Sequence, residues 1–203
     1  MGWLTMSRDA MGGHKTAKAY LDAQFTYERK QSSGGSRGLK VLASSCAGNR
    51  VYYAAVQELS DGRGGEIFAV VCLVLWNPRS ATAEHFGYKD MTEQMGPCEA
   101  QCPAAILDLL TPTDNEHALD WRRRCRANLA LRSRKIEPGA RIRLESPLAF
   151  TDGHVGNEFI VDRIGRKLVL RDPFRGVPYR ISRFMERAWT VVQETKVHKT
   201  VFA

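Results

Sequence analysis

The 203-residue sequence lacks several features that would assign it to a functional class at once. Its longest apolar run, residues 67–76 (IFAVVCLVLW), is about half the roughly 20 residues that a membrane-spanning helix needs. Its glycine-rich segments, QSSGGSRG and DGRGG, lack the spacing of the phosphate-binding motifs G-x-x-x-x-G-K-[ST] and G-x-G-x-x-G. These absences predict no membrane span and argue against nucleotide binding.

Cysteine is also scarce. The five cysteines are an odd number, and the opening MGWLTMSRDAMGG lacks the basic region and apolar stretch of a secretory signal. Both observations predict free thiols in a reducing cytoplasm. A chain of this length buries a core without disulfides or metal. We therefore expect a cytoplasmic protein without a cofactor.

Charge is distributed unevenly along the chain. The formal net charge is +8, but residues 1–120 carry a net −3 and residues 121–203 a net +11. The densest basic stretch, residues 122–143, holds nine basic side chains against Glu137 alone, and eight of the nine are arginine. The planar guanidinium group suits phosphate and carboxylate. The pattern predicts a polyanionic partner, and it leaves open a solvated helix face that forms salt bridges with the acidic N-terminal part.

Periodicity and turn residues predict an N-terminal part with helices and an antiparallel sheet. A helix capped by Thr16 and a flexible loop precede a three-stranded meander, and an irregular segment separates the meander from two further helices. Thr113 and Glu116 match a capping box at the start of the last helix. The expected elements are a helix at 16–30, strands at 39–45, 50–59 and 67–76, an irregular segment at 80–103, and helices at 104–110 and 113–132.

From Pro138 onward, short strands alternate with Gly and Pro. We expect strands at 140–145, 158–164, 167–171, 179–182 and 189–193, and a one-turn helix at 183–187. This pattern resembles an SH3-like barrel. The sequence thus predicts an α+β chain, with an α+β domain at residues 1–134 and a small basic β-barrel at residues 135–203.

On the helix at 113–132, Ala118, Trp121, Cys125 and Leu129 share one apolar face. That spacing predicts that the neighbouring arginines turn toward solvent or a partner. Among the aromatic residues of the barrel, we expect only Phe174 to be exposed. The residues expected to contact nucleic acid or another partner are Arg122, Arg123, Arg126, Arg132, Arg134, Lys135, Arg141 and Arg143.

The segment PCEAQCP (residues 97–103) suggests a different chemistry. It is similar to the P-C-x-x-C motif of zinc deaminases, but three residues separate its cysteines, and His85 lacks a Glu two positions later. Cys98, Cys102 and His85 supply at most three of the four ligands of a structural zinc site. Asp90 and Glu93 offer an acid–base pair or a cation site. Packed thiols and a solvated loop explain the same residues, so we assign no metal ligand and no catalytic residue.

Five short motifs occur together in the first half of the chain: MGWL at the start, KAYLDAQFTYE (18–28), YKDM (88–91), MGP (95–97) and CP (102–103). As a set they resemble an uncharacterised family of short proteins from plasmids, integrated elements and phages of proteobacteria. The resemblance implies a small protein that binds host or element machinery, including restriction or CRISPR complexes.

The sequence therefore predicts a non-catalytic binding protein that acts on nucleic acid or on a nucleic-acid-binding host complex, such as an anti-defence factor. A purely protein partner is compatible with the same basic face. The alternative is an enzyme or zinc-binding protein centred on Cys98, Cys102 and His85.

Overall fold

A computed structural model describes residues 2–165, 167–182 and 184–192. The chain divides into two compact units, Met1–Leu129 and Ala130–Ala203, and the division falls within the helix α3 (Glu116–Ser133). Each unit is described by itself. Within the described residues, no helix combines the length and the apolar character needed to cross a membrane.

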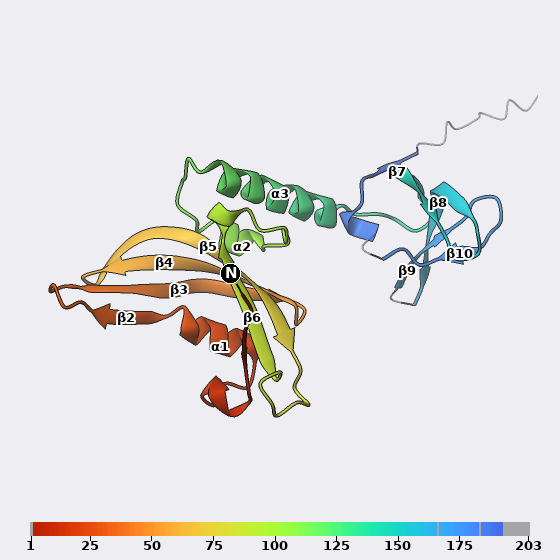
Figure 1. The fold of residues 1–203 in the computed structure, drawn as a ribbon. Helices are drawn as coiled ribbons and strands as arrows, with labels where there is room; N and C mark the ends of the chain where they lie inside the picture. The colour runs from red at the N-terminus through yellow and green to blue at the C-terminus, as the bar shows by residue number, and fades with distance from the viewer. Residues whose placement is uncertain (1, 166, 183, 193–203) are drawn as a thin grey trace, which may run out of the picture. The chain divides into compact units, whose positions relative to one another are not determined.

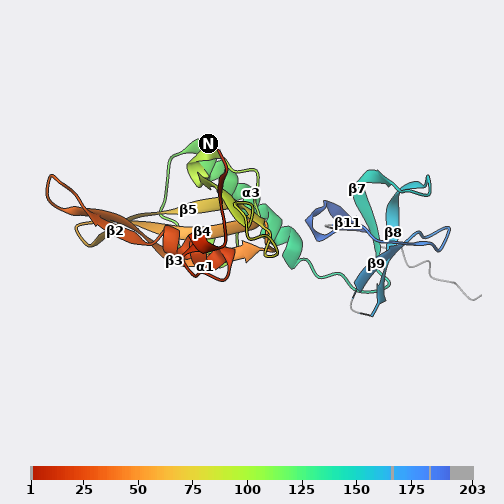
Figure 2. The ribbon, with the colours of Figure 1, turned by 60° about the horizontal axis from the view of Figure 1, so that its bottom comes forward.

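The first unit is built on one strongly twisted antiparallel sheet (Figures 1 and 2). Its six strands lie in the order β1-β6-β5-β4-β3-β2. The expected meander forms the centre of this sheet, and three strands that the sequence pattern did not predict extend it. The strand bounds are β1 Leu4–Met6, β2 Tyr27–Lys30, β3 Ser36–Ala47, β4 Val51–Ser60, β5 Arg63–Trp76 and β6 Phe86–Thr92.

Two of the sequence-based predictions for this unit were wrong. The first helix, α1 (Ala17–Gln24), ends six residues before the predicted residue 30, and the following Tyr27–Lys30 segment pairs with β3 instead. The predicted irregular segment contains β6, which pairs with β5 over seven residues. In both segments the pairing partner outweighs a weak local pattern. The predicted cap is confirmed, because the Thr16 hydroxyl accepts a hydrogen bond from the Ala19 amide at 3.1 Å.

Helices cover both faces of the sheet. On one face, α1 contributes Leu21 to a cluster that includes alternate residues of β4, such as Tyr52. On the other, α2 (Ala104–Leu107) and α3 pack over the intervening residues, such as Tyr53 (Figure 1). Both clusters are buried, which explains why the centre of β4 is apolar without alternation. Residues on opposite sides of this sheet therefore belong to separate cores.

Gly38 is required by the close pairing of β2 and β3. A Cβ atom at this position would lie 2.0 Å from the carbonyl oxygen of Tyr27. We expect Gly38→Ala to lower the free energy of unfolding by about 1–3 kcal/mol and to weaken amide protection in β2, because the two backbones must separate. Urea unfolding and hydrogen exchange measure both effects. Gly65→Ala is the matched control, since its Cβ would meet only ordinary contacts at 3.5 Å; equal losses in both variants would contradict the prediction.

The second unit is the small SH3-like barrel that the sequence predicts. Its five antiparallel strands lie in the order β10-β9-β8-β7-β11, so the last strand returns to pair with the first. A 3-10 helix, η3 (Phe184–Glu186), precedes that last strand. The predicted positions Arg183 and Gln193 lie outside the described residues. The strand bounds are β7 Arg141–Ala149, β8 Val155–Ile164, β9 Lys167–Arg171, β10 Pro178–Tyr179 and β11 Trp189–Val191.

The core of the barrel uses the inward-facing residues of these strands. Ile142 and Leu144 of β7 are buried, while Arg141, Arg143 and Glu145 between and beside them point outward. The buried aromatic side chains include Phe159, Tyr179, Phe184 and Trp189. Phe174 is 86% exposed, so the expectation for the barrel aromatics is confirmed.

Candidate nucleic-acid interface

The helix α3 carries the first part of the basic stretch. It begins at Glu116, and its cap is Asn115, whose side-chain oxygen accepts a hydrogen bond from the Ala118 amide at 3.0 Å. The prediction of a capping box at Thr113 was therefore wrong by two residues, since Thr113 accepts instead from the Asn115 amide. The apolar face is as expected. Ala118, Trp121 and Cys125 are buried against the sheet.

Arg122 does not face solvent or a partner, which corrects the sequence-based prediction. Its guanidinium forms a bidentate ion pair with Glu93, at 2.6 and 2.7 Å, and donates to the carbonyl oxygen of Thr111 at 2.8 Å. The Glu93 side chain is 2% exposed, and it also accepts from the Ala69 amide of β5. Arg122 thus joins α3 to the sheet and the segment after β6, and its charge is already neutralised.

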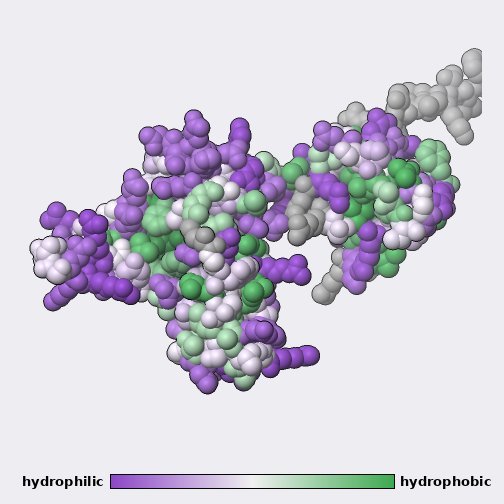
Figure 3. All heavy atoms as spheres, in the orientation of Figure 1, coloured by the Kyte–Doolittle hydropathy of each residue, from purple (hydrophilic) through white to green (hydrophobic). Residues whose placement is uncertain are grey.

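The other arginines of α3 lie outward but are partly paired. Arg123 and Arg126 are 79% and 60% exposed and form surface ion pairs with Asp120 and Asp108. Arg124 contacts the same Asp120 and donates to the carbonyl oxygen of Pro97 at 2.9 Å. Hydrophilic side chains cover this side of the helix in Figure 3. Because these ion pairs are exposed, each contributes little to stability. Another anion can readily replace the carboxylate in each pair.

The remaining predicted residues belong to the second unit. Arg132 lies half-buried in the last turn of α3, and Lys135 is exposed in the segment that leads to β7. Arg134 stacks over the Trp189 ring, with 5.2 Å from its guanidinium carbon to the ring centroid, and donates to the Trp189 carbonyl at 2.9 Å. Arg134 therefore fixes the start of β11 to the segment after α3.

Arg141 and Arg143 share one carboxylate on the outer face of the barrel. Glu158 of β8 accepts from Arg141 at 2.9 Å and from Arg143 at 2.7 Å. The hydrogen bond from Arg143 is the main reason that the pKa of Glu158 lies below its ordinary value. Two cations face one anion here, so this part of the barrel keeps an excess positive charge. Arg143 is the more accessible of the two, with 56% of its side chain exposed against 30% for Arg141.

Arg134 and Arg143, nine positions apart in the sequence, meet at one groove of the barrel. The groove has a volume of about 410 Å³. The β7–β11 pairing places Thr190 directly opposite Arg143, and the buried Trp189 lies beside them. The groove is lined by Arg134, Arg143, Leu144, Glu145, Asn157, Ala188, Trp189 and Thr190. Two guanidinium groups, an amide and a hydroxyl thus line the groove beside one carboxylate, Glu145, so cations outnumber anions along it.

The charge of the second unit agrees with this arrangement. Residues 130–203 contain fifteen Lys and Arg against eight Asp and Glu, a net charge of +7. Arg171 holds Asp162 at 2.7 Å, and Arg175 lies 3.4 Å from Asp152. Exposed basic residues such as Lys167 and Arg180 add to the surplus.

A second cluster of the barrel was not predicted from the sequence. The buried Asp172 accepts from the amides of Phe174 and Arg175, both at 2.8 Å, and lies 2.7 Å from the His154 ring. The Arg175 amide is the leading cause that lowers the pKa of Asp172, so this carboxylate stays ionised. The cluster fixes the turn that presents the exposed Phe174. The sequence DPFRG indicates a turn. It does not indicate the contact between Asp172 and His154, because His154 lies eighteen residues before Asp172.

The residues of the alternative enzyme or zinc site are not brought together. His85 packs against Trp76 on the face covered by α1, whereas Cys102 is buried with Trp121 on the face covered by α3. Cys98 is exposed. Burial raises the pKa of the Cys102 thiol above its ordinary value, which disfavours a thiolate nucleophile. Among the described residues, no three His, Cys, Asp or Glu side chains converge as metal ligands would.

The polar residues of the segment 88–93 also take part in the fold. Tyr88 is buried on β6, and Asp90 pairs with Cys72 of β5 in the strand register. Glu93 is occupied by Arg122. The segment is therefore a strand and its continuation, not the irregular loop that the sequence suggested.

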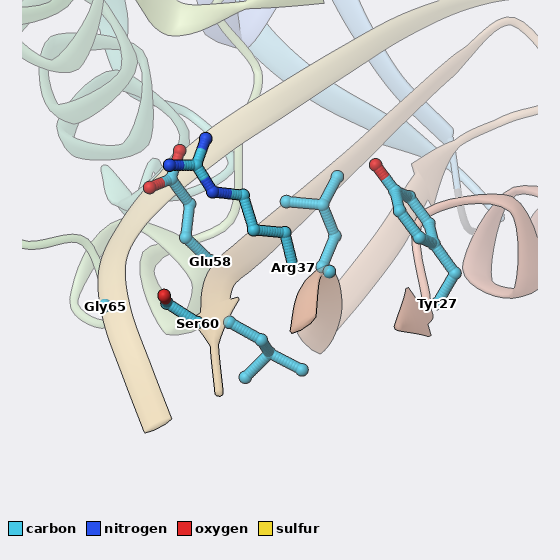
Figure 4. A pocket seen from close by; sticks show the side chains of 8 residues that line it. Tyr27, Arg37, Glu58, Ser60 and Gly65 are labelled. Carbon is cyan, nitrogen blue, oxygen red and sulfur yellow. The ribbon is translucent and has the colours of Figure 1, made fainter. Parts of the chain in front are cut away.

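A further hollow of about 380 Å³ is lined by residues of β2 to β5 (Figure 4). Arg37 and Leu39 of β3 pair with Ser60 and Glu58 of β4, so the side chains of Arg37 and Glu58 share one face. Figure 4 shows their charged ends directed toward each other. Opposite charges occupy this hollow together, which makes it a weaker polyanion site than the barrel groove.

Comparison with known proteins identifies one similarity. Residues 112–184 match a family described as a domain of unknown function, DUF6927. The match covers α3 and the barrel as far as η3, and so includes both parts of the basic stretch. Neither the comparison with curated proteins nor that with solved structures found a match.

Proposed function

We propose that this chain is a non-catalytic binding protein that holds nucleic acid on the outer face of its SH3-like barrel. The observation that carries the proposal is the groove where Arg134 and Arg143 converge, on a unit of net charge +7. Guanidinium groups bind phosphate through paired hydrogen bonds. Asn157 and Thr190 add donors of the kind that contact the sugar–phosphate backbone.

The proposed interface lies on the barrel and not on α3. Arg122 supports the fold, and Arg126 has its own carboxylate partner. Arg123 and Arg143 each share a carboxylate with a neighbouring arginine, and of these two Arg143 also lines the groove with Arg134. The exposed Phe174, beside Arg175, offers an aromatic surface on which an unpaired base can stack. Neither the arginine-lined groove nor the exposed Phe174 contacts base edges. We therefore expect binding with little sequence preference and a steep dependence on salt.

The resemblance to proteins of mobile elements supplies a setting for this activity. We extend the proposal to a nucleoprotein target, such as a host defence complex, on that resemblance alone. The alternative, an enzyme or zinc protein at Cys98, Cys102 and His85, has weaker support because Cys102 and His85 lie on opposite faces of the sheet.

Reversing the charge of Arg143 tests the proposal. We expect Arg143→Glu to weaken binding of labelled single-stranded DNA or RNA by about tenfold and to reduce the salt dependence, because phosphate contacts are lost. Fluorescence anisotropy between about 50 and 200 mM salt measures both quantities. Arg141 remains to hold Glu158 in the variant.

Arg126→Glu is the matched control, since Arg126 has a similar exposure, 60% against 56%, and lies on α3. It should bind as the wild type does. No binding at the lowest salt concentration would overturn the proposed function. A loss in Arg126→Glu as large as that in Arg143→Glu would contradict its placement on the barrel.

A further inference from the structure

A hollow with a volume of about 560 Å³ lies near the N-terminus of the first unit. The segment after β1 forms one wall, and the residues that connect β5 to β6 form the other. The lining residues are Arg8, Asp9, Gly13, His14, Lys15, Trp76, Pro78 and His85. The volume lies within the range of ordinary small-molecule sites.

One hydrogen bond joins the two walls of this hollow, and further contacts order the second wall. Arg8 donates to the carbonyl oxygen of Pro78 at 3.0 Å, across seventy positions of the sequence. The His85 ring lies 2.5 Å from the Ser80 carbonyl through Nδ1 and meets the Trp76 ring edge-on at 5.1 Å. His85 is only 4% exposed. Arg8 thus ties the first wall to a second wall in which His85 is fixed by its own contacts.

The side chains at this hollow combine basic groups with an aromatic ring. Two permanent cations, Arg8 and Lys15, line the hollow together with one carboxylate, Asp9, and two imidazoles add further hydrogen-bonding groups. Lys15 is exposed, and the half-buried Trp76 supplies an indole surface. Cations favour an anionic ligand, and the indole favours a planar ring beside it.

We propose that this hollow binds a small aromatic anion of the nucleoside monophosphate class, with the base against Trp76 and the phosphate near Lys15 and His14. The proposed site contains no glycine-rich phosphate-binding loop. The absence of such motifs from the sequence therefore does not exclude a nucleotide in this hollow. The site belongs to the first unit and is independent of the groove on the barrel.

Isothermal titration calorimetry with AMP tests the inference. We expect saturable binding at submillimolar concentration, and weaker binding of inorganic phosphate or adenosine alone, because each lacks half of the recognised group. Lys15→Ala should weaken AMP binding by about fivefold or more through loss of a charged hydrogen bond. Trp76→Leu should weaken it through loss of the ring surface.

Lys40→Ala, which removes another exposed lysine, is the control and should bind AMP as the wild type does. Trp76 packs against the core, so its variant is first compared with the wild type by circular dichroism; Lys15 is exposed and tests the site even if Trp76→Leu fails to fold. Absence of AMP binding at about 5 mM would overturn the inference. Equal affinity for phosphate and AMP, or unchanged affinity in Lys15→Ala, would do the same. Arg143→Glu should leave AMP binding intact, which separates this test from that of the barrel.

Discussion

Replacing Arg122 by alanine is expected to lower the free energy of unfolding of the first unit by about 3–5 kcal/mol. The variant leaves the Glu93 carboxylate, 2% exposed, without its bidentate partner. It also removes the donor to the Thr111 carbonyl. An isolated buried charge is costly because the protein interior solvates it poorly.

Urea unfolding followed by tryptophan fluorescence measures this loss. Arg123→Ala removes a neighbouring arginine that is 79% exposed, and it should change the free energy of unfolding by less than about 0.5 kcal/mol. Replacing both members of the pair, Arg122→Leu with Glu93→Leu, should recover part of the stability because no charge is left buried. Equal unfolding midpoints for Arg122→Ala and the wild type would refute the structural role.

Trp121→Ala is expected to cost a similar amount, about 3–5 kcal/mol, for a different reason. Trp121 is fully buried between α3 and the sheet, and its indole N–H donates to the Glu99 carbonyl at 2.8 Å. The truncation opens a cavity in this core and leaves the Glu99 carbonyl without that donor. α3 then loses its principal contact with the sheet.

Leu119→Ala provides the comparison, because Leu119 lies on the same helix but is 48% exposed. It should shift the free energy of unfolding by no more than about 0.5 kcal/mol. Thermal unfolding followed by far-ultraviolet circular dichroism reports both variants, since Trp121→Ala removes one of the fluorophores. A Trp121→Ala variant as stable as Leu119→Ala would show that α3 does not depend on this anchor.

The sequence pattern predicts the parts of the fold that strong local signals define. The apolar run predicts residues 67–76 of β5, which begins four residues earlier at Arg63, and the barrel follows from short strands separated by Gly and Pro. The pattern does not predict β6, because FGYKDMT mixes aromatic and charged residues and becomes a strand only by pairing with β5. It also extends α1 into Tyr27–Lys30, where pairing with β3 determines the structure. Long-range pairing is the information that the local pattern lacks.

The same limit applies to the basic residues. Helical spacing correctly separates the buried Trp121 and Cys125 from the exposed Arg123 and Arg126. It misplaces Arg122, because its partner Glu93 is 29 positions away and belongs to a segment that the pattern left irregular. The meeting of Arg134 with Arg143 depends on the return of β11 to β7, a pairing that the local sequence pattern does not contain.

The helix α3 is matched with the barrel in sequence but packs on the sheet of the first unit. Its sequence is matched together with the barrel as part of one domain family, yet its apolar face is buried against the sheet of the first unit. Separated from that sheet, the matched segment of this chain would expose Trp121, which is fully buried here. The matched segment of this chain thus depends on residues outside it to cover one face of its helix.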